Sequence, residues 1–432
     1  MAPVPVDQAL AQLARDDPAA AEDAGALYDA LTWGEGLETI TQHGLQTLLW
    51  YELPRKFVGG PPKLEMALAL GHLLERAGMP RYAAICRSQE TAGVLAAWER
   101  GDRDGFAALG RAMDRSGVEP PDLPDFEWGD VMDGLEAGTR ELVSQRLELA
   151  IAAGNLRPCA PGWRERQREI AGQLLLAPRA DLHGQSPLAA IRAQRARAWA
   201  CRRSGARRKL LEPLLAELSG ELDRHAARPL PALAWLLRRS AEGLPLTAAG
   251  FLAPAFVREA VERFGLESYG DSPRRESDVP ALGELHDLIL ELRAVRKRKR
   301  ELRLTPSGRA LIEDPAALWQ AAAGGLTAGG GFAATASELA LALVLEVRSP
   351  DDSQARLATI LEEEGWREQQ TGLPPSRETV MAYYFGVVRR LRAVGGLTGE
   401  RWFERPIELS PPGRAVALEA LRQRARAPLP RF

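Results

Sequence analysis

The chain has 432 residues, of which 45% are hydrophobic and 26% charged. This is an ordinary globular composition, and it excludes extensive disorder and collagen-like repeats. Its 56 basic and 58 acidic residues leave a net charge of −2. The three cysteines are widely spaced and form no Cys-x-x-Cys pair, so neither a zinc site nor a disulfide framework is predicted.

The sequence shows no targeting or membrane-spanning segment. The N-terminus lacks the basic and apolar regions of a signal peptide. The longest apolar stretches fall well short of the roughly 20 residues that a spanning helix needs. We therefore expect a soluble, cytoplasmic protein with no membrane partner, and free thiols fit that reducing compartment.

Helical patterns dominate the first half of the chain. Apolar side chains recur every three or four residues, which is typical of helices with one buried face. The expected helices are 6–15, 20–32, 37–53, 63–77, 80–99, 102–116, 130–153 and 162–176. Because no alternation of period two precedes residue 230, we predict an all-helical domain over 1–225 with short loops between antiparallel helices.

A short motif occurs three times in the second half. It is Leu-Thr-Ala-Ala-Gly at 246–250, Leu-Thr-Pro-Ser-Gly at 304–308 and Leu-Ser-Pro-Pro-Gly at 409–413. Leucine would end a strand, and the hydroxyl residue would cap the next helix. Proline is tolerated at the first helical position, and glycine allows the helix to approach the sheet closely. Each copy is thus predicted to mark a strand followed by a capped helix.

The segments before the second and third copies follow one order. Before the second copy, a helix over 281–295 is followed by the bases 296–300 and a strand at 302–304. Before the third copy, a helix over 379–394 is followed by the charged segment 401–405 and a strand at 407–409. Helix, charged two-stranded wing and capped helix is the winged-helix order, a variant of helix-turn-helix. The first copy either follows a short wing of its own or opens the unit whose wing is 296–303.

These patterns predict a mainly α protein with a helical N-terminal domain followed by two winged-helix-like units that carry short β-hairpin wings. The units are expected at 228–322 and 335–425. A flexible glycine-rich linker is expected at 323–334.

The run from Leu246 to Leu311, followed by Asp314-Pro315 and Leu318-Trp319, is similar to the C-terminal region of actinobacterial proteins described as plasmid ORF-3-like. It also resembles a winged-helix segment near the N-terminus of some bacterial helicase-associated proteins. The resemblance covers residues 230–425 and implies a winged-helix fold there. The small β-rich N-terminal domain of the ORF-3-like proteins is not apparent, since helices occupy that place. Those proteins are of unknown function, so no residue's role is implied.

No catalytic or cofactor-binding motif is present. The five histidines form neither His-Glu-x-x-His nor His-x-His, and Gly-x-Ser-x-Gly is absent. The glycine-rich stretch 324–331 lacks the Lys-Ser/Thr of a phosphate-binding loop. The acidic cluster around Glu127, Asp130 and Asp133 does not have the spacing of an EF-hand. We expect a protein that is not an enzyme and has no metal and no cofactor, with His286 near the surface of its helix.

Basic residues concentrate in two runs. Residues 191–209 hold eight bases and no acid, and residues 293–303 hold seven bases and one acid. A wing of this kind contacts phosphates and positions the module without reading bases, and the other run could follow a nucleic-acid backbone. The predicted nucleic-acid contacts are Arg296, Lys297, Arg298, Lys299, Arg300, Arg303, Arg389, Arg390, Arg401, Arg405, Arg202, Arg203, Arg207, Arg208 and Lys209.

Two functions remain open at this point. The favoured one is non-catalytic binding of nucleic acid, in the first place DNA, in a regulatory or mobile-element-associated role. The alternative is a protein-interaction scaffold whose domains bind a partner or self-associate. Two observations support the alternative: the helix before the first wing carries Glu284, Asp287 and Glu291, which repel phosphate, and the pI near 6.3 is low for a DNA-binding domain.

Overall fold

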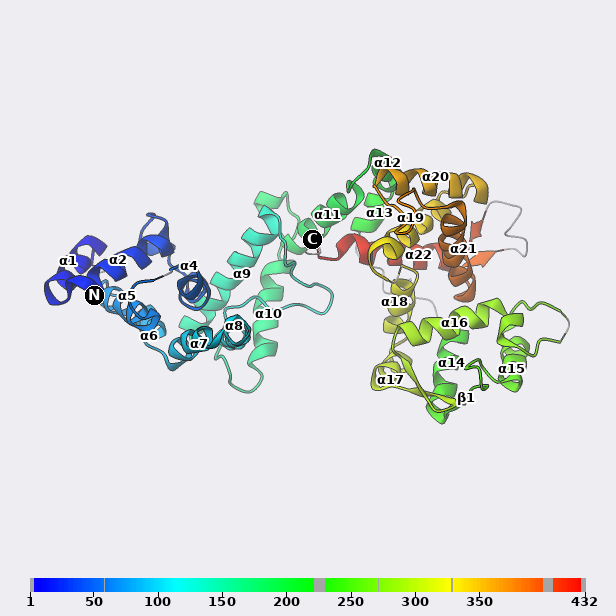
Figure 1. Cartoon of the computed structure of the whole chain (residues 1–432), viewed down its shortest axis with the longest axis horizontal. Coiled ribbons are helices and arrows are strands. Elements are labelled where there is room, and N and C mark those ends of the chain that lie inside the picture. The colour runs from blue at the N-terminus through cyan, green and yellow to red at the C-terminus, as the bar shows by residue number, and fades with distance from the viewer. Residues whose placement is uncertain are drawn as a thin grey trace. The chain divides into compact units, whose positions relative to one another are not determined.

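A computed structural model describes residues 4–57, 59–220, 230–270, 272–327, 329–398 and 407–428. Contacts divide the chain into two compact units, residues 1–188 with 428–432 and residues 189–427 (Figure 1). Helices make up most of both units, which confirms the prediction of a mainly α protein. Among the described residues, no helix is both long and apolar enough to cross a membrane.

The first unit is built from short, capped helices. They are α1 (Val6–Asp16), α2 (Pro18–Thr32), α3 (Gln42–Thr47), α4 (Leu53–Lys56), α5 (Lys63–Arg76), α6 (Pro80–Cys86), α7 (Gln89–Arg100), α8 (Asp102–Ser116), α9 (Gly134–Ala152) and α10 (Trp163–Leu176). Asp17, Thr41, Ser88 and Asp133 each accept a backbone N–H at a helix start, which satisfies a donor that the helix leaves unpaired. α2 packs against α5 and α7 against α8, so helices of this unit bury their apolar faces against one another.

The second unit contains a lobe with a small antiparallel sheet. This first lobe comprises α14 (Pro231–Glu242), β1 (Leu244–Pro245), α15 (Pro254–Phe264), α16 (Pro280–Glu291), β2 (Val295–Arg298), β3 (Glu301–Leu304), α17 (Pro306–Glu313) and α18 (Pro315–Gly325). The strand order is β1-β3-β2. Leu302 of β3 pairs with Leu244 of β1 on one side and with Lys297 of β2 on the other. The hairpin predicted at 296–304 is therefore present, and β1 joins it to the start of the lobe.

The rest of the second unit repeats part of this order. It comprises α19 (Gly331–Leu345), α20 (Pro350–Glu363), α21 (Arg377–Ala393), β4 (Leu397–Thr398), β5 (Glu408–Leu409) and α22 (Pro411–Arg426), joined by α11 (Pro187–Ala200), α12 (Gly205–Leu211) and α13 (Leu215–Ser219) from earlier in the chain. β4 pairs with β5 in antiparallel fashion. The described ends of this second hairpin lie where the sequence predicted it.

The division of the chain differs from the one expected. Trp199, Leu210 and Leu218, which the sequence placed in the N-terminal domain, share one apolar cluster with Leu339 and Leu421 of the C-terminal half. α12 packs on α19 and α20, and α13 packs on α22. Helical periodicity shows which face of a helix is buried and does not show which partner buries it.

The expected glycine-rich linker is largely helical. Gly324 and Gly325 end α18, and Gly331 begins α19. A β-carbon on Gly325 would collide with Leu288 of α16. Gly325 therefore serves the close packing of two helices, which is a different role from a flexible connection.

The second and third copies of the repeated motif form the predicted caps. Thr305 Oγ1 accepts the Gly308 N–H at 3.1 Å, and Ser410 Oγ accepts the Gly413 N–H at 3.0 Å. A β-carbon on Gly308 would collide with the Ala294 carbonyl, and one on Gly413 with the Gly396 carbonyl. At each glycine, the helix start therefore lies in close contact with the backbone residue just before the first strand of the hairpin.

The first copy does not cap a helix, so that prediction is wrong. The Thr247 N–H donates to the Phe251 carbonyl at 2.7 Å, and Gly250 has φ +86° in the resulting turn. An isolated bridge between Leu246 and Leu252 closes this turn, and α15 begins only at Pro254. Because β1 pairs with β3, the first copy belongs to the lobe that carries the 296–303 hairpin, the second of the two roles open to it.

Candidate nucleic-acid interface

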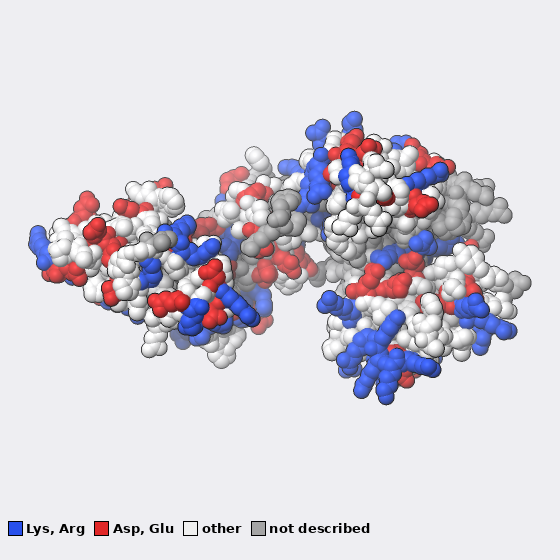
Figure 2. All heavy atoms as spheres, viewed as in Figure 1, with Lys and Arg blue, Asp and Glu red and all other residues white. Residues whose placement is uncertain are grey.

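The hairpin of β2 and β3 carries an exposed group of five bases, which we call the basic wing: Arg296, Lys297, Arg298, Lys299 and Arg300. Lys299 has φ +57° in the two-residue turn between the strands. All five side chains are exposed, and none has an ion-pair partner among the described residues. In Figure 2, Lys and Arg gather at the end of this lobe where Figure 1 labels α17 and β1.

The core anchors this hairpin from one face only. Val295 is 4% exposed and Leu302 is fully buried, whereas Arg296 and Arg303 are paired directly across the ladder. Like charges opposite each other destabilise a sheet, and Glu301 relieves only Arg303, at 2.7 Å. Sheet stability does not account for Arg296 at this position, and a bound anion would offset the repulsion.

The turn at 246–251 lies directly beside the basic wing. The Leu246 N–H donates to the Arg300 carbonyl at 2.8 Å, and Lys297 Nζ lies 3.6 Å from where a β-carbon on Gly250 would be. Phe251 in this turn is 54% exposed. The sequence interpretation missed Phe251, because it assigned this motif copy to a helix cap; the missed signal was a phenylalanine directly after a turn glycine.

Helix α16, which precedes the wing, is covered on one side by another helix of the same unit. It packs against α21, where Arg389 Nε lies 2.9 Å from Glu284 and Arg390 Nη2 lies 2.5 Å from Glu291. Arg390 Nη1 also donates to the Gly325 carbonyl at 2.6 Å. Two of the three acidic residues that we expected to repel phosphate, Glu284 and Glu291, thus neutralise the arginines that we expected to contact it.

This pairing changes the expected roles of Arg389 and Arg390. Both lie in the second unit against α16, and Arg390 is only 22% exposed in its side chain. On α16 itself, Asp287 and Glu291 are the exposed positions. A helix in this environment has no basic or amide side chains turned outward to read a base edge.

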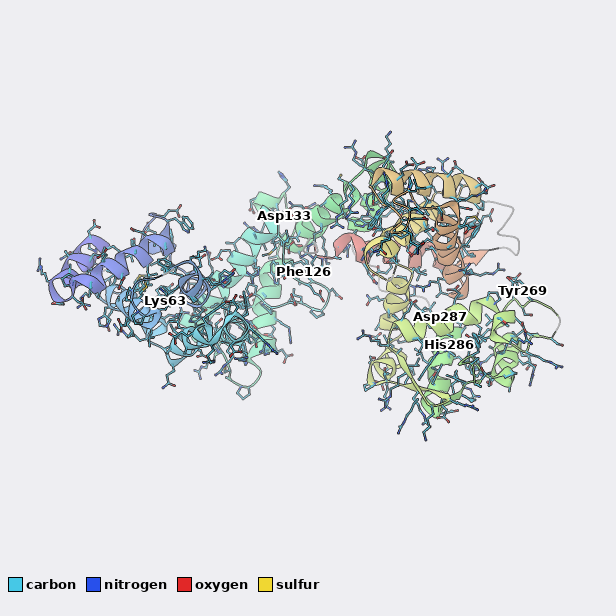
Figure 3. All side chains as sticks on the ribbon, in the orientation of Figure 1. Lys63, Phe126, Asp133, Tyr269, His286 and Asp287 are labelled. Carbon is cyan, nitrogen blue, oxygen red and sulfur yellow. The ribbon has the colours of Figure 1, made fainter. Side chains whose placement is uncertain are left out.

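His286 is buried, so the expectation that it lies near the surface is wrong. It is 3% exposed, and its Nδ1 lies 2.8 Å from Glu276 Oε1. The other oxygen of Glu276 accepts the Leu252 N–H at 2.6 Å. Figure 3 labels His286 and its neighbour Asp287 on α16. The pair ties α16 to the end of the 246–251 turn, which is a structural role.

The second basic run is divided between core and surface. Arg207 is 2% exposed, so the structure removes it from the predicted interface. Arg203 lies over the Trp366 ring at 5.0 Å. Burial, with the neighbouring Arg207 guanidinium, lowers the pKa of Arg202. Arg208 and Lys209 are exposed and have no ion-pair partner in the described part of the chain. Arg401 and Arg405 lie outside the described residues.

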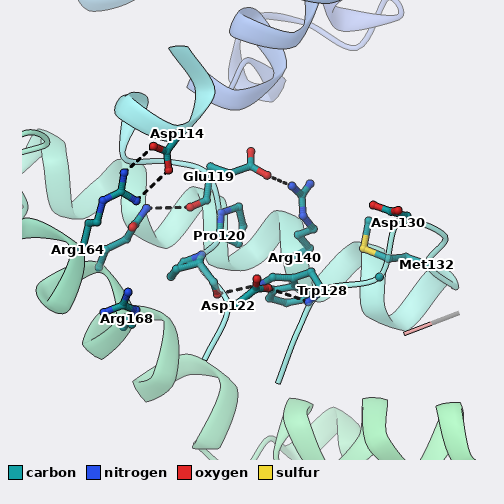
Figure 4. A pocket seen from close by; sticks show the side chains of 13 residues that line it. Asp114, Glu119, Pro120, Asp122, Trp128, Asp130, Met132, Arg140, Arg164 and Arg168 are labelled. Atoms are coloured by element: carbon teal, nitrogen blue, oxygen red, sulfur yellow. Dashed lines mark hydrogen bonds and ion pairs between the residues drawn. The ribbon is translucent and has the colours of Figure 1, made fainter. Parts of the chain in front are cut away.

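A separate polar pocket of about 630 Å³ lies in the first unit (Figure 4). Arg164 pairs with Asp114 at 2.5 Å, and Arg140 pairs with Glu119. Gln167 donates to the carbonyls of Gly117 and Glu119 and so holds the segment that follows α8. These four charged side chains of the pocket are thus paired with one another. Within the described residues there is no group of three or more His, Cys, Asp or Glu side chains that could hold a metal ion.

Part of the second unit matches a known family model. Residues 230–317 match the family model of the Y4jL N-terminal domain, a range that begins just before α14, contains α14 to α17, and ends in the first turn of α18. No curated protein and no solved structure matches the chain. The match lies at the start of the 230–425 region identified from sequence, and it contains the basic wing and most of the lobe that carries it.

Proposed function

We propose that the second unit binds nucleic acid, in the first place DNA, without catalysing a reaction. The basic wing, residues 296–300, would contact backbone phosphates and hold the molecule in place. The observation that carries the proposal is that these five bases are exposed and have no ion-pair partner among the described residues, while Arg389, Arg390 and Arg392 of α21 are all ion-paired. A regulatory or mobile-element-associated role in the cytoplasm is consistent with the free Cys86, Cys159 and Cys201.

The topology of the first lobe supports the proposal. The lobe has a helix, a strand, two helices and a hairpin in chain order, with strand order β1-β3-β2. We interpret this arrangement as a winged helix. Because α16 is covered by α21, the proposed contact is made by the wing and does not read sequence through the helix. Phosphate contacts of this kind give affinity and orientation with little base specificity.

Binding through the basic wing predicts a steep dependence on salt. Five phosphate contacts give a slope of log affinity against log salt of about −4 to −5 on duplex DNA. Raising salt from about 50 to about 200 mM then weakens binding by roughly 10²- to 10³-fold. Fluorescence anisotropy with a labelled duplex measures this slope. Binding that does not change with salt would exclude phosphate contact as the main source of affinity.

A protein-interaction scaffold is the second candidate function. The contact of α16 with α21 favours it, because the helix that reads DNA in helix-turn-helix proteins is used here for protein–protein packing within one chain. If the whole protein binds no oligonucleotide at low salt, this candidate becomes the better account.

A further inference from the structure

Phe251 is the large apolar side chain presented beside the basic wing. It is 54% exposed, and it is not among the residues packed against the apolar cluster of the second unit. The turn that carries it is fixed at both ends: the Leu246 N–H donates to the Arg300 carbonyl, and the Leu252 N–H donates to Glu276 at 2.6 Å. The ring is thus held at the surface by a well-anchored backbone.

The surroundings of Phe251 are small and cationic. Pro245, Ala248 and Ala249 are exposed in the same segment and carry no charge. Lys297 Nζ lies 3.6 Å from where a β-carbon on Gly250 would be. An accessible aromatic face next to a row of cations is the combination by which proteins hold unpaired bases and their phosphates together.

We infer that Phe251 stacks on an unpaired base while the basic wing holds the adjoining phosphates, so that the ligand class is single-stranded nucleic acid. This inference rests on the proposed function and names its substrate. In a duplex both faces of each base are covered by neighbouring bases, so a ring beside the backbone gains a stacking partner only where bases are unpaired or the step is opened. An anionic membrane fits less well, because a single large apolar side chain buries little area in an interface.

The test compares a labelled single strand of about 20 nucleotides, long enough for several contacts, with the same sequence as a duplex. Phe251→Ala is expected to weaken single-strand binding by about tenfold, the loss of one stacked base, and to leave duplex binding within about twofold. Phe251→Trp should retain single-strand binding, since it keeps an aromatic face. Tyr269→Ala is the matched control: Tyr269 is 69% exposed, and it lies after α15 in the same lobe (Figure 3).

The outcomes separate this inference from the proposed function. If alanine at 296–300 weakens binding and Phe251→Ala changes neither ligand, or both equally, the stacking inference is overturned and phosphate binding by the wing stands. If the unaltered protein binds neither oligonucleotide, both are overturned. Binding instead to vesicles of phosphatidylserine and phosphatidylcholine, lost in Phe251→Ala, would also overturn both and assign the surface to membranes.

Discussion

Alanine at all five positions of the basic wing, 296–300, is expected to weaken nucleic-acid binding by roughly 10²-fold or more at low salt and to bring the salt slope close to zero. Each lost phosphate contact removes about 0.9 from the slope on duplex DNA. Anisotropy titrations of the variant and the unaltered protein, at two or more salt concentrations, measure both quantities.

The five substitutions leave the hairpin's anchors in place. Val295 and Leu302 remain buried, and the repulsion between Arg296 and Arg303 across the ladder is removed. The circular-dichroism spectrum and melting temperature should therefore be close to those of the unaltered protein.

A control variant with the same change in net charge replaces five exposed bases of the first unit, none with an ion-pair partner among the described residues: Arg103, Arg111, Arg146, Arg157 and Arg168. It should bind as the unaltered protein does. Equal losses in the two variants would mean that net charge, and not the wing, determines binding.

Arg207→Ala is expected to destabilise the second unit by about 3–5 kcal/mol, because it leaves the buried Glu364 without its cation and leaves the buried Glu338 with only Arg424, at 3.1 Å. Arg207 Nη2 lies 2.6 Å from Glu338 and Nη1 lies 3.2 Å from Glu364, and all three side chains are at most 4% exposed. Arg207 Nε also donates to the Trp199 carbonyl at 2.9 Å. The residue thus joins α12 to α19 and to the end of α20, and urea unfolding followed by tryptophan fluorescence measures the loss.

Two further variants test the cause of that loss. Arg414→Ala removes a pair with Glu217 in which both side chains are 43% exposed, and such exposed pairs contribute about 0–1 kcal/mol. Changing Glu338 and Glu364 to glutamine alongside Arg207→Met should recover part of the stability, since no buried charge is then left unpaired. If Arg207→Ala costs no more than Arg414→Ala, the buried cluster does not stabilise the unit.

Local chemistry made much of the fold predictable. The caps at Thr305 and Ser410 follow from a hydroxyl residue, a proline and a glycine at fixed spacing. The hairpin at 295–304 could be predicted because a run of bases lies between a helix with one apolar face and the helix cap at Thr305. In both cases the information lies within about a dozen residues of sequence.

What the sequence did not show depends on contacts across long separations. Glu284 and Arg389 are more than a hundred positions apart, and no local pattern indicates that α21 covers α16. Arg207 lies in a run of bases that is typical of a solvated face, yet it is buried and pairs with Glu338 and Glu364. His286 is likewise buried, and it pairs with Glu276 in the short 3-10 helix Glu276–Asp278 that precedes α16. Charged residues were misplaced because their partners are set by tertiary packing.

Lysine acetylation footprinting tests the central claim most directly. The chain has five lysines, of which Lys297 and Lys299 lie in the basic wing and Lys56 and Lys63 in the first unit. With saturating oligonucleotide, mass spectrometry should show that Lys297 and Lys299 are protected from acetylation while Lys56 and Lys63 react as before. Equal acetylation of Lys297 and Lys299 with and without bound oligonucleotide would contradict the assignment of this hairpin as the phosphate-binding surface.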